Sequence, residues 1–130
     1  MARFLKKNKA SLLRAPGSVI FIGQQKMKQA RVTVMDYDQG QLRELDLQKA
    51  EGDRFRKTDA VTWINVDGVH DTDLIMEIGR NFELHPLILE DIVHTGQRPK
   101  VEEYDDCIFL VVKMLRLDQA DEQVVGEQLS

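Results

Sequence analysis

Two adjacent carboxylates, Glu90 and Asp91, are the side chains with the clearest chemical potential in this chain. They stand between two prolines that delimit a short helix. Pro86 suits the first helical position, because its missing N–H would lack an intrahelical partner there. Pro99 biases the residue before it away from helical geometry, so the chain must leave the helix by then. The spacing predicts a helix over 86–93 that carries both acids.

A helical wheel divides this helix into two faces. Leu87 lies opposite the apolar residues, between Glu90 and Asp91, and the two carboxylates diverge by about 100° around it. Divergent carboxylates do not easily chelate one ion together, so each would serve a separate ion or need ligands from elsewhere. An exposed leucine between acids suits a surface against which a second helix or subunit packs. The alternative is a solvated polar face with an incidental leucine. The buried arc comprises Ile88, Leu89, Ile92 and Val93.

The second acidic cluster, residues 102–106, gives a weaker signal. In a strand, alternate residues face opposite ways, so its four acids cannot all point at one ion. We interpret it as a charged edge that discourages sheet aggregation, or as a turn. Surface pairing with Arg98 or Lys100 would be worth little on its own.

Other signatures of chemistry are absent from the sequence. The three histidines have spacings that match no zinc motif, and the lone Cys107 cannot complete a thiolate site. The chain contains no P-loop, dinucleotide-binding or serine-nucleophile motif. Acids at 71 and 73 are better explained as caps at the start of a helix.

The remaining pattern predicts the elements that position the acidic helix. Strand, two helices and strand in succession suggest a right-handed crossover. We therefore predict an α/β domain with a mixed (parallel and antiparallel) β-sheet flanked by helices. The apolar stretch 107–117 fits a central strand that is covered on both faces. Extended segments are expected at 31–37, 41–45, 61–66, 100–104, 107–117 and from 123 onward.

Composition limits the classes of function. Residues 1–31 hold eight basic residues and no acid, whereas the remainder holds ten basic and 22 acidic residues. We interpret 1–17 as a basic, flexible tail and 18–130 as one domain, incomplete at its C-terminus. An acidic body argues against nucleic acid as a partner and favours cations. The longest apolar run, 107–112, is far shorter than the roughly 20 residues of a membrane-spanning helix.

The run 85–104, together with Thr-Trp-Ile-Asn-Val-Asp-Gly at 62–68, resembles the cytosolic N-terminal domain of CorA-type magnesium transporters. The resemblance extends from about Pro16 to the end of the chain. It implies a homo-oligomeric ring, a pentamer in the full-length protein. It also implies that Glu90 and Asp91 bind regulatory Mg²⁺, or Co²⁺, together with acids from a neighbouring subunit. Leu87 then lies at the interface between subunits.

The resemblance also implies where the whole protein resides. The membrane-spanning segment would follow Ser130, which places this domain on the cytoplasmic side of the inner membrane. The leading hypothesis is a regulatory, cation-sensing domain without enzyme activity. Alternatives are a domain of a related zinc transporter, a soluble interaction domain without metal control, and a metal-dependent hydrolase. The hydrolase would use Glu90, Asp91 and Asp105 or Asp106, but it lacks a base–nucleophile arrangement.

Overall fold

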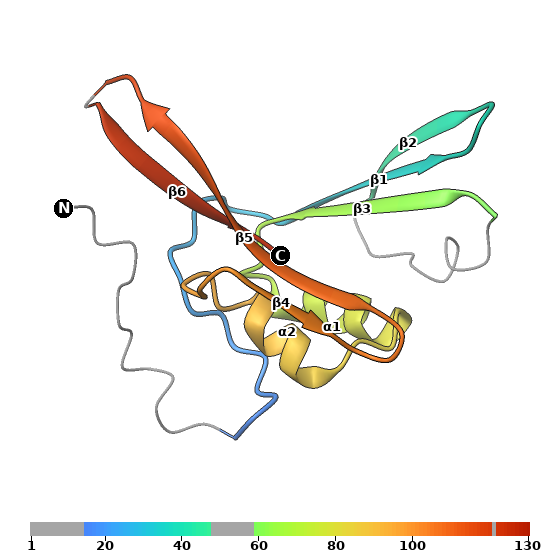
Figure 1. Cartoon of the computed structure of the whole chain (residues 1–130), viewed down its shortest axis with the longest axis horizontal. Helices are drawn as coiled ribbons and strands as arrows, with labels where there is room; N and C mark the ends of the chain where they lie inside the picture. The colour runs from blue at the N-terminus through green and yellow to red at the C-terminus, as the bar shows by residue number, and fades with distance from the viewer. Residues whose placement is uncertain (1–14, 48–58, 121) are drawn as a thin grey trace.

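The computed structural model describes residues 15–47, 59–120 and 122–130 (Figure 1). Most of the tail predicted over residues 1–17 therefore lies outside the described residues. The elements, in chain order, are β1 (Arg31–Tyr37), β2 (Leu42–Leu47), β3 (Val61–Asp67), α1 (Thr72–Asn81), α2 (Pro86–Ile92), β4 (Lys100–Glu103), β5 (Ile108–Asp118) and β6 (Gln123–Leu129). The elements predicted from the sequence are confirmed, with small shifts at their ends.

The strands form two separate three-stranded sheets, in the orders β2-β1-β3 and β4-β5-β6. Every pairing between these strands is antiparallel. The predicted fold class is therefore wrong: the described residues are mostly β, with two antiparallel sheets and two short helices, and contain no mixed sheet. The predicted crossover fails because β3 and β4, which flank the helices, belong to different sheets. Three of the four strand pairs close through short local turns, which antiparallel strands allow.

Local signals explain where the two helices begin. The Asp71 side chain accepts a hydrogen bond from the Leu74 N–H at 3.1 Å, which confirms the predicted cap of α1. His85 precedes α2, and its Nδ1 accepts the Leu87 N–H at 3.2 Å. Pro86 follows at the first helical position, where a missing N–H costs least.

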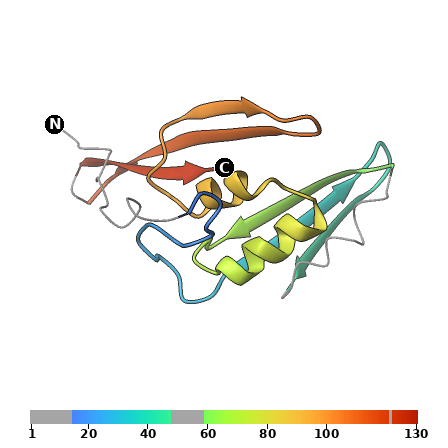
Figure 2. The same cartoon turned by 90° about the horizontal axis from the view of Figure 1, so that it is seen from below.

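Helix α2 joins the two halves of the core. Leu89 and Val93 pack with Ile75 of α1, whereas Ile88 packs with Phe109 and Val111 of β5. Figure 2 shows α1 along one face of the β2-β1-β3 sheet and α2 between that sheet and the β4-β5 hairpin. The buried arc of α2 is therefore enclosed on two sides, which leaves only the face of Leu87, Glu90 and Asp91 directed outward.

The segment before β1 returns to the end of α2. The Ile22 N–H donates to the Val93 carbonyl at 2.9 Å, and the Thr95 N–H donates to the Ile22 carbonyl at 3.0 Å. These bonds form the single parallel bridge, between Ile22 and His94, in the described part of the chain. The segment of residues 16–22 thus lies against α2 as a strap.

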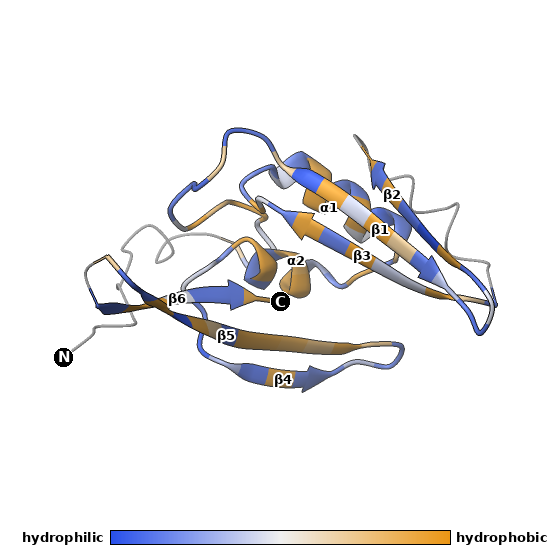
Figure 3. Cartoon of the chain, turned by 90° about the horizontal axis from the view of Figure 1, so that it is seen from above, coloured by the Kyte–Doolittle hydropathy of each residue, from blue (hydrophilic) through white to orange (hydrophobic). Residues whose placement is uncertain are grey.

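In the described ranges each sheet has one face that is covered at least in part and one bare face; on β5 the cover extends over Phe109 and Val111 but not over Leu115 and Leu117. Phe109 and Val111 are buried beneath α2, whereas Ile108 on the opposite face is 71% exposed. The prediction that 107–117 is covered on both faces is therefore wrong, although β5 is apolar along most of its length (Figure 3). Trp63, which its apolar character would place in the core, is also exposed, on the face of β3 opposite α1. No helix among the described residues is long and apolar enough to cross a membrane.

Candidate functional site

A pocket of about 380 Å³ opens beside the outward face of α2. The acids predicted from the sequence, Glu90 and Asp91, both line it, and so does Leu87, which is 41% exposed. A third carboxylate, that of Glu102, reaches the same pocket from β4, opposite the helix. Pro16 and Tyr104 complete the lining. The structure therefore gathers three carboxylates around one exposed leucine.

Glu90 is held by the strap. Its Oε2 accepts a hydrogen bond from the Gly17 N–H at 2.7 Å, although the two residues are 73 positions apart. Gly17 has a φ of +83°, a conformation that favours glycine. A Cβ at this position would also lie 3.1 Å from the Cβ of Pro86. A glycine is thus required where the backbone approaches the start of α2 and donates to Glu90.

Asp91 is held by the loop and strand that follow α2. Its Oδ2 accepts from the Lys100 ammonium at 2.5 Å, and its Oδ1 accepts from the Gln97 side-chain amide. The same ammonium donates to Glu102 Oε1 at 2.7 Å. Glu102 Oε2 in turn accepts from the Tyr104 hydroxyl at 3.3 Å. Glu90 and Asp91 are thus held by different segments, the strap before β1 and the loop and strand that follow α2.

The electrostatics of the pocket centre on Lys100. Burial lowers the pKa of Lys100, but hydrogen bonds and charge attraction from Asp91 and Glu102 outweigh it, so the net shift is upward. The hydrogen bond from Lys100 lowers the pKa of Glu102. The ammonium also lies 5.3 Å from the centroid of the Phe109 ring, within the range of a cation–π contact. Three carboxylates and one ammonium leave the pocket with a formal charge of −2.

The pocket suits a cation but does not complete a binding site alone. Its charged lining groups are carboxylates, and hard cations such as Mg²⁺ prefer oxygen ligands. Among the described residues, no three His, Cys, Asp or Glu side chains are grouped closely enough to hold a metal ion. A single ion at Glu90 or Asp91 therefore needs further ligands from water or another chain.

The predicted pairing of Lys100 with the acidic cluster is confirmed at Glu102, but sequence reasoning missed its contact with Asp91 and the role of Gln97. The alternation of a strand places Lys100 and Glu102 on one face, and this signal was available. The interpretation of 102–106 as a charged edge did not include the contact of that face with α2. Gln97 had no such signal, because its contacts depend on how the loop folds: its backbone N–H donates to Gln128 Oε1 of β6 at 3.1 Å.

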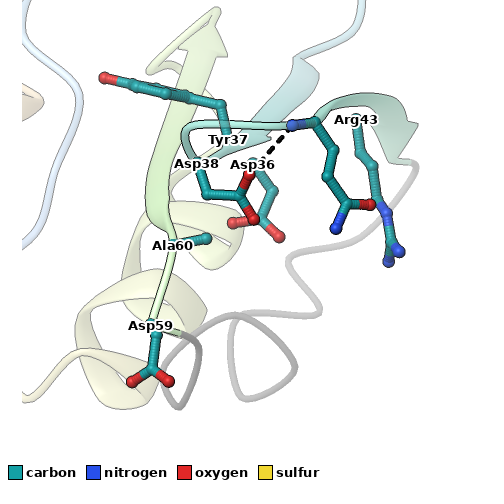
Figure 4. Close-up of a pocket in the computed structure, with 7 residues that line it drawn as sticks. Asp36, Tyr37, Asp38, Arg43, Asp59 and Ala60 are labelled. Atoms are coloured by element: carbon teal, nitrogen blue, oxygen red, sulfur yellow. Dashed lines mark hydrogen bonds between the residues drawn. The ribbon is translucent and has the colours of Figure 1, made fainter.

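A second pocket, of about 260 Å³, lies at the β1-β2 turn (Figure 4). Two of its three acids, Asp36 and Asp38, have structural roles. Asp38 Oδ1 accepts the N–H groups of Gly40 at 2.7 Å and Gln41 at 2.9 Å, which closes the turn. Asp36 Oδ1 accepts the Thr62 hydroxyl at 3.0 Å, which joins β1 to β3. These contacts explain Asp36 and Asp38 without a ligand.

Comparison with known proteins identifies the family to which this chain belongs. Residues 58–129 match the model of the family described as CorA-like Mg²⁺ transporter protein. The chain belongs to this family, which confirms the resemblance seen in the sequence. It is also 36% identical over 116 residues to the cobalt/magnesium transport protein CorA of Thermotoga maritima. That alignment covers 88% of this chain and 33% of the relative, so the chain spans about one third of the relative's length.

Proposed function

We propose that this chain is the cation-sensing, subunit-contacting domain of a CorA-like Mg²⁺ or Co²⁺ transport channel, located on the cytoplasmic side of the membrane. Glu90 and Asp91 supply one half of a regulatory site, and a neighbouring subunit of the homo-oligomer supplies the other. Leu87 packs against that neighbour. The observation that carries the proposal is the outward face of α2, where an exposed leucine lies between two carboxylates that share one acidic pocket.

The physical basis is repulsion between acidic faces. Two unit charges about 4 Å apart interact with about 1 kcal/mol in water, and about 4 kcal/mol at an effective dielectric constant of 20. A cation between two subunits converts this repulsion into attraction. Moving a two-state equilibrium from 1:99 to 99:1 takes about 5.5 kcal/mol, which a few such interfaces supply. High internal cation concentration therefore holds the ring closed, and low concentration loosens it.

The chemistry of the pocket favours this proposal over the alternatives. A zinc site usually draws on imidazole or thiolate, and neither lines the pocket. A hydrolase would need Asp105 or Asp106 beside Glu90, but both are exposed at the β4-β5 turn and do not line the pocket. A domain without metal control accounts for the intrachain contacts of these acids, but not for the exposed Leu87 between the two helix carboxylates.

Removal of one charge tests the proposal in the full-length transporter. Asp91→Asn keeps the size of the side chain but removes the charge that recruits the cation. In this variant we expect that Mg²⁺ no longer stabilises the closed state. A ligand shifts an equilibrium only by its differential affinity for the two states, and the variant lacks the charge that provides this difference. The measurements are protection from proteolysis and ion flux, each against Mg²⁺ concentration.

The matched control is Asp105→Asn, the same substitution at an exposed acid outside the pocket. It should titrate like the wild type. If Asp91→Asn also titrates like the wild type, the carboxylate of Asp91 has no regulatory role and the proposal fails.

A further inference from the structure

Lys100 already places a positive charge where the proposed cation would bind. Its ammonium lies between Asp91 and Glu102, at 2.5 Å and 2.7 Å, and its side chain is only 26% exposed. Both carboxylates line the pocket beside α2. A lysine ammonium has three donors and no acceptor, so it can occupy carboxylate oxygens but cannot help to ligate a metal ion.

The backbone fixes Lys100 in this position. Pro99 restricts the backbone just before it. Antiparallel pairing of Lys100 with Val111 then anchors it to the central strand of the sheet. The side chain extends across the Phe109 ring towards α2. The ammonium is therefore tethered opposite Asp91. Unlike a free cation, it is present there at an effective concentration that does not change with the cation concentration of the solution.

We propose that Lys100 is a built-in competitor of the divalent cation at Asp91. The ammonium neutralises Asp91 while no cation is bound, and it must leave Asp91 before a cation takes those oxygens. Lys100 thereby sets the cation concentration at which the site fills. This inference rests on the proposed function, because it assumes that Asp91 is a cation ligand.

Removal of the competitor should tighten binding. Lys100→Met retains an unbranched chain that packs on Phe109 and removes the charge. The wild type must break a partly exposed ion pair to bind the cation, whereas the variant need not. We expect the dissociation constant for Mg²⁺ to fall about tenfold, equivalent to about 1.4 kcal/mol. Lys100→Arg, which keeps a cation opposite Asp91, should bind no more tightly than the wild type.

A titration of the chain with MgCl2 at constant ionic strength measures these constants. Backbone amide NMR signals of α2 report binding even at the millimolar affinity expected when part of the ligand set is missing. Lys26→Met is the matched control: it changes net charge equally and breaks the exposed Lys26–Glu127 ion pair. By strand register, Glu127 lies on the face of the β4-β5-β6 sheet directed away from α2.

The outcomes separate this inference from the proposed function. Tighter binding by Lys100→Met, with Lys26→Met unchanged, supports competition. Equal tightening in both variants, or none in Lys100→Met, overturns it. If Asp91→Asn leaves wild-type binding unaltered, the proposed site itself fails. If Asp91→Asn abolishes binding while Lys100→Met matches the wild type, the site stands and only the competition is wrong.

A measurement on the wild type tests the proposal without any substitution, so it does not depend on whether a variant folds. The ammonium signal of Lys100 in a nitrogen-resolved NMR spectrum reports its hydrogen bonds directly. MgCl2 should alter this signal with the same midpoint as the α2 amides. If the α2 amides titrate and the ammonium signal does not change, Lys100 does not leave Asp91 and the competition is disproved.

Discussion

Glu90 and Asp91 are neighbours on α2, yet different parts of the chain hold them. The strap donates to Glu90 through the Gly17 N–H, whereas Gln97 and Lys100 donate to Asp91. The adjacent acids are therefore positioned by two independent sets of contacts. A change in the strap would reorient Glu90 and leave Asp91 in place, so the two carboxylates can be tested separately.

The ion pair of Lys26 and Glu127 makes a small, pH-dependent contribution to the stability of the folded chain. The hydrogen bond from Lys26, followed by its charge, lowers the pKa of Glu127. A carboxylate with a lowered pKa adds stability above its unfolded pKa of about 4.3, and this stability is lost as pH falls through the folded value. Both side chains are about half exposed, so the contribution is below about 1 kcal/mol.

We therefore expect Glu127→Gln to lower the thermal midpoint slightly at about pH 6 and to have a smaller effect at about pH 3. Thermal unfolding followed by circular dichroism at both pH values measures this difference. A deficit of equal size at both pH values would show that the glutamate acts through packing rather than charge.

Helices α1 and α2 meet at a glycine. A Cβ added to Gly79 would lie 2.5 Å from Leu89 Cδ1, and Leu89 is buried between the helices. Gly79→Ala gains about 1 kcal/mol of helix propensity but incurs an overpacking cost of about 1–3 kcal/mol. We expect a net loss of about 1 kcal/mol in the free energy of unfolding, measured by urea denaturation.

The double variant Gly79→Ala/Leu89→Ala provides the control. Leu89→Ala alone leaves a cavity and should cost about 2–5 kcal/mol. The added methyl group at position 79 then has room, so the double variant should lose less than the sum of the two single losses. A Gly79→Ala variant as stable as the wild type would contradict the close approach of the helices.

The elements were more predictable than their arrangement. Pro86, Asp71 and the spacing of apolar residues act within a few residues of the structure that they determine, so the helices and strands could be located from the sequence. The partition into two sheets could not, because it depends on which strand edges meet after folding. The same limit hid Lys100: strand alternation pairs it with Glu102, but only the packing of β4 against α2 brings it to Asp91.

At the scale of the whole molecule, the β4-β5-β6 sheet leaves one apolar face uncovered among the described residues. By strand register this face carries five exposed apolar side chains: Val101, Ile108, Leu110, Met114 and Leu129. An exposed apolar patch on this scale is typical of an interaction surface or of a tendency to aggregate. The covered face, with Phe109 and Val111, carries the stability of the sheet.

Lysine substitutions should distinguish the two faces. Val101→Lys/Ile108→Lys should reduce binding of an apolar fluorescent dye and change the free energy of unfolding by less than about 1 kcal/mol, since both side chains are largely exposed. Val111→Lys should unfold the chain, because it buries an unpaired charge. Unaltered dye binding by the double variant would show that the bare face is not the surface that the dye contacts.

The strap has a kinetic consequence. The three tight hairpin pairings join residues close in the sequence, whereas the Gly17–Glu90 contact closes a separation of 73 residues. Closure of a long loop costs more conformational entropy than closure of a short one. Contacts of this kind therefore form late in folding and open early in local fluctuations. Native-state hydrogen exchange should therefore release the Gly17 and Ile22 amides before those of β5. The acidic pocket is then the last part of the domain to be completed, and it loosens first.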